Sequence, residues 1–171
     1  MIALEPPGNV ARDLALFRRG LFAGLGEGSA LAFPETIPLA FAAPGDGIEP
    51  RALDACWDGI DGSFSSSGLV VSRGLLYLAI GGPLAPLRAR AADAFRARAP
   101  SYADPPLEAG LGVFLCKPAD PPLALALAER IGPPRASFRD CALVLLKLRL
   151  GADPFAALVW REFARSKRRT G

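Results

Sequence analysis

The stretch ETIPLAFAAPG, residues 35–45, decides how the rest of the chain is interpreted. Its larger apolar residues fall at every second position from Ile37 to Phe41, and a period of two is typical of a strand. A strand that offered a reactive pair to a cleft would carry it at alternate positions, where this one has Pro38 and Ala40. The stretch therefore predicts either an active-site strand that has lost its chemistry or a plain buried strand.

The segments on both sides alternate between strand and helix patterns. A helix is expected after Pro7, with Asn9 as its N-cap and with Arg18 on its solvent face. The remaining expectations are helices over 49–60, 83–99 and 120–134, a hairpin over 63–82 that turns near Ser72–Gly74, and strands over 1–4, 111–117, 140–150 and 153–163. This order predicts an α+β protein made of two similar halves, each a small sheet with helices on one face.

Composition indicates an ordinary globular chain. Its 171 residues are enough for one domain, and its 51% hydrophobic content includes no apolar run near the ~20 residues of a membrane span. The first ten residues lack the charged and apolar regions of a signal peptide. Cys56, Cys116 and Cys141 are odd in number and widely spaced, which favours reduced core residues over disulfides or a zinc site. We therefore expect a cytoplasmic protein with no membrane partner.

The net charge of +3 comes from the end of the chain. Residues 161–171 carry five basic side chains and one acidic one, so the preceding 160 residues hold 15 basic and 16 acidic side chains, a net charge of −1. The main part of the chain is therefore not a strongly basic nucleic-acid binder. Residues 165–171 are expected to form a flexible basic tail that could contact phosphates, and residues 1–164 to form the single domain.

The sequence contains no histidine, the commonest general acid or base near neutral pH and the commonest metal ligand. Its acidic residues show no paired-carboxylate or metal-ligand spacing, so neither a metal nor a cofactor is expected. Cys116 could act as a nucleophile only beside a cation, and the adjacent Lys117 points to the opposite face of a strand.

The chain resembles the two-histidine phosphoesterase superfamily, in particular its branch of 2′-5′ RNA ligases and RNA 2′,3′-cyclic phosphodiesterases. IALEPPGNV at 2–10 is similar to that family's first strand and turn, while ETIPLAF at 35–41 and GVFLCK at 112–117 stand where it has its two His-x-Thr strands. The segments 74–82, 83–95 and 139–155 are similar to its later elements. The resemblance implies a two-lobed fold, with two antiparallel sheets and outer helices around a central cleft, in which two histidines act as general base and general acid.

Transferred position by position, the first His-x-Thr pair falls on Pro38 and Ala40, and the second on Gly112 and Phe114. All four positions therefore lack the family's chemistry. Among the residues that could still bind a ligand, Thr36 precedes the first pair, Lys117 stands where the family tends to have arginine, and Phe155 lies near a common tyrosine.

These observations predict a non-catalytic relative, a pseudoenzyme that binds a ligand or a partner, with nucleotide or RNA as candidates for the cleft or the basic tail. Two alternatives stay open. One is a phosphodiesterase or RNA-processing enzyme with rebuilt chemistry that uses Thr36, Lys117, Arg135 or Arg139. The other is a structural interaction module whose functional part is the tail.

Overall fold

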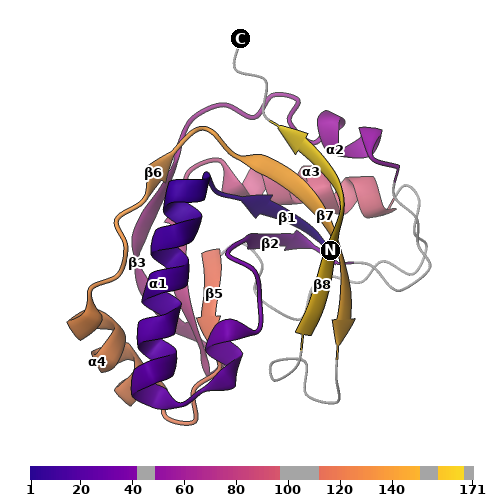
Figure 1. Ribbon diagram of the computed structural model, residues 1–171. Coiled ribbons are helices and arrows are strands. Elements are labelled where there is room, and N and C mark those ends of the chain that lie inside the picture. The colour runs from indigo at the N-terminus through magenta and orange to yellow at the C-terminus, as the bar shows by residue number, and fades with distance from the viewer. Residues whose placement is uncertain (42–48, 97–111, 151–157, 168–171) are drawn as a thin grey trace.

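The computed structural model describes residues 1–41, 49–96, 112–150 and 158–167, shown as coloured ribbon in Figure 1. The elements are β1 (Ile2–Glu5), α1 (Gly8–Leu25), the 3₁₀ helix η1 (Gly28–Leu31), β2 (Ile37–Ala40), α2 (Arg51–Ala55), β3 (Phe64–Ser72), β4 (Leu75–Gly81), α3 (Leu84–Arg96), β5 (Gly112–Cys116), α4 (Pro121–Ile131), β6 (Ser137–Phe138), β7 (Ala142–Leu150) and β8 (Leu158–Lys167). The α+β class and the hairpin turn after Ser72 are confirmed, whereas the two-residue strand β6 was not predicted.

The strands form two antiparallel four-stranded sheets. We call the sheet of order β2-β1-β7-β8 the terminal sheet, because its strands come from both ends of the chain, and the sheet of order β5-β4-β3-β6 the central sheet. The expectation that each half of the sequence builds its own sheet is therefore wrong. β1 lies between β2 and β7, with Ala3 opposite both Pro38 and Val144, so the first and last parts of the chain share one sheet.

One hydrophobic core joins the two sheets and the helices. Ile2 and Leu4 of β1 pack in the same buried cluster as Leu76 and Leu78 of β4, together with the inner face of α1. In Figure 1, α1 and α4 lie beside the central sheet, and α2 and α3 lie near the β7–β8 pair. Contacts of α4 with β3 and β4, and of α2 with β7 and β8, agree with this arrangement.

Each sheet also carries a small apolar cluster apart from the main core. On the terminal sheet it is Met1, Ala3, Val144 and Leu146, with Phe41 packed against it. On the central sheet it is Ala32, Phe33, Leu75, Tyr77 and Phe114. Both sheets are therefore buried on two faces in these regions, which explains why all four residues of β2 and all five of β5 are buried instead of alternating with solvent.

The ends of α1 and α4 follow from local chemistry. Asn9 is not the N-cap of α1, because the cap is Pro7, two residues earlier, whose fixed φ suits a helix entry. Gly26 ends α1 in the left-handed conformation, with φ +70°, and its N–H donates to the Phe22 carbonyl. In α4 the side chain of Asp120 accepts a hydrogen bond from the Leu123 N–H at 3.0 Å.

Residues 165–167 belong to β8, although the sequence places them in the basic tail. Ser166 is buried and its hydroxyl donates to the Asp54 carboxylate of α2 at 2.5 Å. This bond fastens the end of β8 to α2. Residues 168–171 lie outside the described residues.

The helices of the described ranges include none with the length and hydrophobicity of a transmembrane span.

Candidate functional site

The two strands aligned with the His-x-Thr motifs, β2 and β5, are the edge strands of the two sheets, and they contact each other. Figure 1 shows both in the middle of the molecule, between α1 and the β7–β8 pair. We call this region the β2–β5 junction. The four positions predicted to line a cleft therefore come from two strands that contact each other, one at the edge of each sheet. They are Pro38, Ala40, Gly112 and Phe114.

Pro38 and Ala40 of β2 are both buried. Pro38 has no N–H to donate to a ladder, which confines proline to edge strands, and β2 is the edge of the terminal sheet. Neither residue can carry a proton. Pro38 pairs with Ala3, a member of the small cluster on this sheet, so apolar packing occupies its surroundings.

Gly112 occupies a backbone position that no side chain can take. Its φ is +140°, a region that L-residues rarely adopt. A Cβ atom there would lie 2.0 Å from the carbonyl oxygen of Leu78 and 2.9 Å from the backbone nitrogen of Ile80, both in β4. Because β4 and β5 pair at this point, a histidine or any other residue at 112 would push the strands apart.

Phe114 fills its surroundings with aromatic contacts. It is 2% exposed, and its ring lies edge-on to Phe33, with 5.1 Å between centroids, and edge-on to Tyr77, with 5.9 Å between centroids. Such T-shaped pairs add about 0.5–1.5 kcal/mol beyond the burial of area. Where the resemblance places a phosphate-holding hydroxyl, the protein has a packed aromatic cluster.

Arg18 lies on the buried face of α1, whereas the helical pattern of the sequence predicts the solvent face. It is 1% exposed, and its Nη1 donates to the carbonyl of Phe33 at 2.5 Å and to the Glu35 carboxylate at 3.3 Å. Its Nε and Nη2 have no hydrogen-bond partner within the described part of the chain. Burial lowers the pKa of the guanidinium, and the charge of Glu35 opposes that shift. The contact fixes the segment that leads into β2.

Cys116 at the end of β5 is fully buried, and the positive charge of Arg18 acts on its thiol. Burial raises the pKa of its thiol to about 11, reinforced by Glu27, and Arg18 only partly opposes this. At neutral pH the group is therefore a thiol and not a nucleophilic thiolate. Burial likewise raises the pKa of Cys56 to about 11. The cationic neighbour was found in the structure, but it does not activate the sulfur.

The structure places two of the candidate ligand-binding residues beside the β2–β5 junction. Thr36 is buried just before β2, and Lys117 is exposed just after β5, where its N–H donates to the Ser29 hydroxyl at 2.9 Å. Arg18 hydrogen-bonds to the segment before β2, and its charge acts on the thiol of Cys116 at the end of β5. Thr36 and Lys117 therefore lie at the same end of the junction. Phe155 lies outside the described residues.

A groove of about 530 Å³ lies elsewhere, beside an irregularity in the β3–β4 pairing near Ser66–Gly68. Its wall includes Ser67, Arg135 and the residues that follow α4, but not Thr36, Lys117 or Arg139. The Ser66 hydroxyl, also in this wall, already accepts a hydrogen bond from the Ala136 N–H at 2.9 Å. The cations and hydroxyls of the rebuilt-enzyme alternative are thus not brought into this groove together.

Among the described residues, no group of three or more Cys, Asp or Glu side chains is placed to hold a metal ion. Comparison of the chain with protein-family models, with curated proteins and with solved structures finds no match.

Proposed function

We propose that this chain is a non-catalytic binding protein, built on a scaffold like that of the two-histidine phosphoesterases and lacking their chemistry. In this proposal the β2–β5 junction corresponds to the family's cleft, and its two strands contribute no proton-transfer group. Two paired antiparallel sheets with outer helices are what that scaffold would require. The absence of histidine from the sequence removes both the general base and the general acid.

The observation that carries the proposal is the backbone of Gly112. The position aligned with the second histidine has φ +140° and no space for a Cβ atom. A catalytic side chain at position 112 is thus excluded by the backbone of the β4–β5 pair, and not only replaced by a substitution. Phe114, two residues later, replaces a hydroxyl with a buried ring.

Turnover of model substrates tests the proposal. The purified chain is incubated with a 2′,3′-cyclic nucleotide and with a 2′-5′-linked dinucleotide, and product is measured by chromatography. Loss of one general acid or base lowers a rate by about 10²–10⁴, so the loss of both predicts no hydrolysis above the buffer control. Hydrolysis at the rate of a histidine-containing phosphodiesterase would contradict the proposal.

A thermal-shift screen with the same nucleotides tests for a retained binding function. A ligand at 100 times its Kd stabilises the folded state by about 2.7 kcal/mol. Stabilisation without turnover would support a nucleotide-binding pseudoenzyme. Stabilisation that is lost when residues 168–171 are deleted would instead place the binding in the basic end of the chain, as the alternative of a structural interaction module predicts.

A further inference from the structure

β8 has an outer edge that is exposed on both faces. It is the outer strand of the terminal sheet and, among the described residues, it pairs only with β7. Trp160, Arg161, Glu162 and Phe163 are four consecutive exposed residues, with Trp160 45% and Phe163 67% exposed. Trp160 and Arg161 pair regularly with Leu148 and Lys147, before the register shift at Phe163. Successive residues of a regular strand point to opposite faces, so neither face of β8 is covered at Trp160 and Arg161. An uncovered edge is a template for another strand.

The exposed part of β8 also carries positive charge that the described residues do not neutralise. Lys147 of β7 lies directly opposite Arg161 of β8, and both are exposed. Like charges at directly opposite positions destabilise a strand pair. Neither side chain has an acidic partner in the described part of the chain. A carboxylate brought close to Arg161 would relieve this repulsion.

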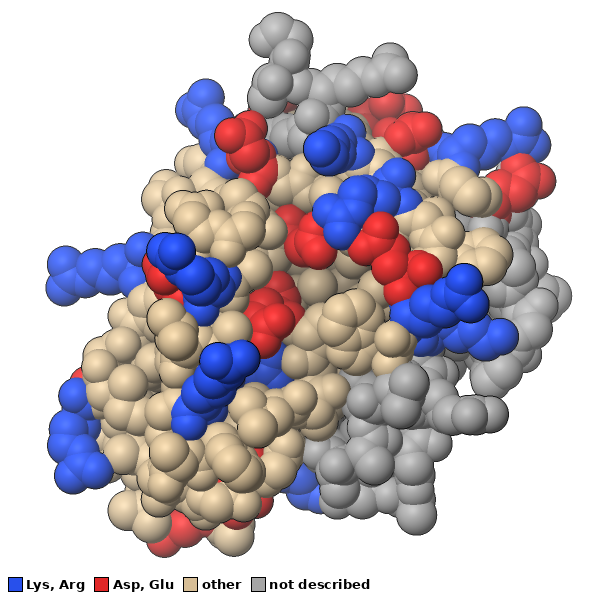
Figure 2. Space-filling view, viewed as in Figure 1, with Lys and Arg blue, Asp and Glu red and all other residues tan. Residues whose placement is uncertain are grey.

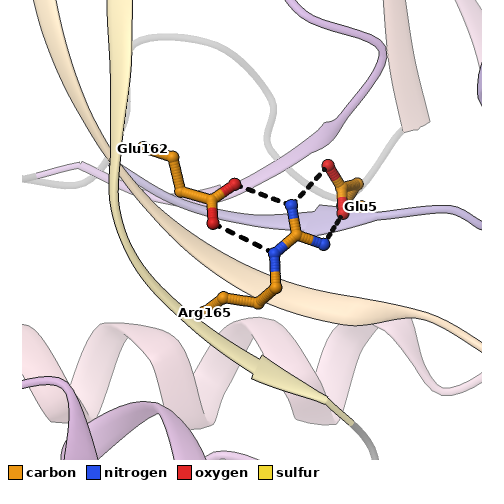
Figure 3. A network of polar contacts seen from close by, with 3 residues as sticks. All are labelled: Glu5, Glu162 and Arg165. Atoms are coloured by element: carbon orange, nitrogen blue, oxygen red, sulfur yellow. Dashed lines mark hydrogen bonds and ion pairs between the residues drawn. The ribbon is translucent and has the colours of Figure 1, made fainter.

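The neighbouring acidic residue is already engaged. Figure 3 shows Arg165 between Glu162 and Glu5, with its Nη2 2.7 Å from Glu162 and 3.1 Å from Glu5. The two hydrogen bonds that the Glu162 carboxylate accepts from Arg165 lower the pKa of that carboxyl group. Glu162 therefore stays ionised on Arg165 and does not compensate Arg161.

We propose that the outer edge of β8 binds an acidic, extended peptide segment of a partner protein, which adds to the terminal sheet as a further strand. Main-chain hydrogen bonds to the edge supply affinity, and side chains at alternate positions supply specificity. A carboxylate opposite Arg161 lies on the face of the Lys147–Arg161 pair, and apolar side chains of the partner cover Trp160 on the opposite face. The proposal does not depend on the phosphoesterase resemblance.

A second copy of this chain is disfavoured in the registers that pair the charged part of β8 with itself. In antiparallel self-pairing centred anywhere from residue 161 to residue 165, Arg161 lies opposite itself, Arg165 or Lys167, or else Glu162 or Arg165 lies opposite itself. Each arrangement sets like charges against each other. In these registers, charge favours an acidic strand over a copy of β8.

A nucleic acid is disfavoured by the distribution of charge. Residues 1–160 have a net charge of −1, and Figure 2 shows acidic and basic side chains interspersed over the face it presents, with a mainly uncharged area over α1 and α4. Polyanion binding normally uses a continuous basic surface. The few cations of the β7–β8 pair match a short acidic segment better than a long phosphate backbone.

The test measures binding of fluorescein-labelled probes by anisotropy to the full chain. The first probe is a ten-residue peptide in which glutamate alternates with valine and tyrosine. The second is the same peptide N-methylated at every residue, which keeps its charge and side chains but removes the backbone N–H donors from both of its edges. The third is a single-stranded oligonucleotide. Arg161→Glu is compared with Arg19→Glu, an exposed position of α1 that receives the same change in charge.

We expect the unmodified peptide to bind, and the methylated peptide to bind at least ~10-fold more weakly because backbone pairing is lost. Arg161→Glu should weaken binding of the peptide by ~10-fold, and Arg19→Glu by less than ~2-fold, because rim charges act locally. Equal binding of both peptides, equal effects of both substitutions, or no peptide binding would overturn the proposal. Binding of the oligonucleotide in preference to the peptide, lost in Arg161→Glu, would overturn it in favour of a nucleic-acid surface.

Discussion

Gly112→Ala tests whether the β2–β5 junction is closed to side chains by its own backbone. At φ +140° an L-residue is strained, at a cost of about 1–2 kcal/mol for an unfavourable positive-φ conformation. The added Cβ would stand 2.0 Å from the Leu78 carbonyl oxygen, and overpacking of this kind costs about 1–3 kcal/mol. Together these terms predict a loss of about 2–5 kcal/mol in the free energy of unfolding.

Gly59→Ala is the matched control. Gly59 also has a positive φ, +69°, but no atom lies within 4 Å of a Cβ there, so only the conformational term of about 1–2 kcal/mol applies. Both variants are unfolded in urea, with the fluorescence of Trp57 and Trp160 and far-ultraviolet circular dichroism as probes. If Gly112→Ala is no less stable than Gly59→Ala, a side chain can be accommodated at 112, and the argument from Gly112 fails.

Three further predictions concern buried groups. Burial lowers the pKa of the Met1 amino group from 8.0 to about 6, so between pH 6 and 8 the unfolded chain binds a proton that the folded chain does not. The free energy of unfolding should therefore rise with pH over this range, by at most about 3 kcal/mol. A free energy of unfolding that chemical denaturation finds independent of pH, or the same slope in an N-acetylated chain, would contradict this. Glu35→Ala leaves the buried charge of Arg18 without its ion-pair partner and should lower the free energy of unfolding by about 3 kcal/mol. Arg18→Met removes the buried charge itself and should lower it by only about 1 kcal/mol. If urea unfolding gives the reverse order, the ion pair does not govern this contact. Phe114→Ala should cost about 3–5 kcal/mol because it empties the aromatic cluster, and a loss below about 1 kcal/mol would mean that the cluster is not tightly packed.

Much of the architecture could be predicted from local signals. The apolar alternation in residues 37–41, the turn at Arg73–Gly74 and the proline and glycine boundaries of α4 each reflect nearest-neighbour chemistry, and each element formed where expected. The sheet order could not be predicted in the same way, because it depends on pairing between segments such as β1 and β7 that lie more than 130 residues apart.

The features of the site that were missed have a common physical origin. Arg18 looks like a solvent-facing cation on a helical wheel, but the segment before β2 crosses α1 there and covers it, so its burial depends on tertiary packing. Gly112 looks like an ordinary strand residue in the sequence, and its importance comes from the closeness of the β4 backbone. Gly26, by contrast, acts locally, because its left-handed conformation and the bond from its N–H to the Phe22 carbonyl end α1.

The thiol of Cys116 gives the most direct test of a closed, unreactive β2–β5 junction. Cys56→Ala/Cys141→Ala leaves it as the single cysteine, and its reaction with an aromatic disulfide reagent is followed at pH 8 in the folded and the urea-unfolded chain. Because the thiol is fully buried with a pKa raised to about 11, the folded chain should react at least ~100-fold more slowly than the unfolded chain. A folded-state rate within tenfold of the unfolded rate would contradict the account and indicate an open junction with an accessible sulfur.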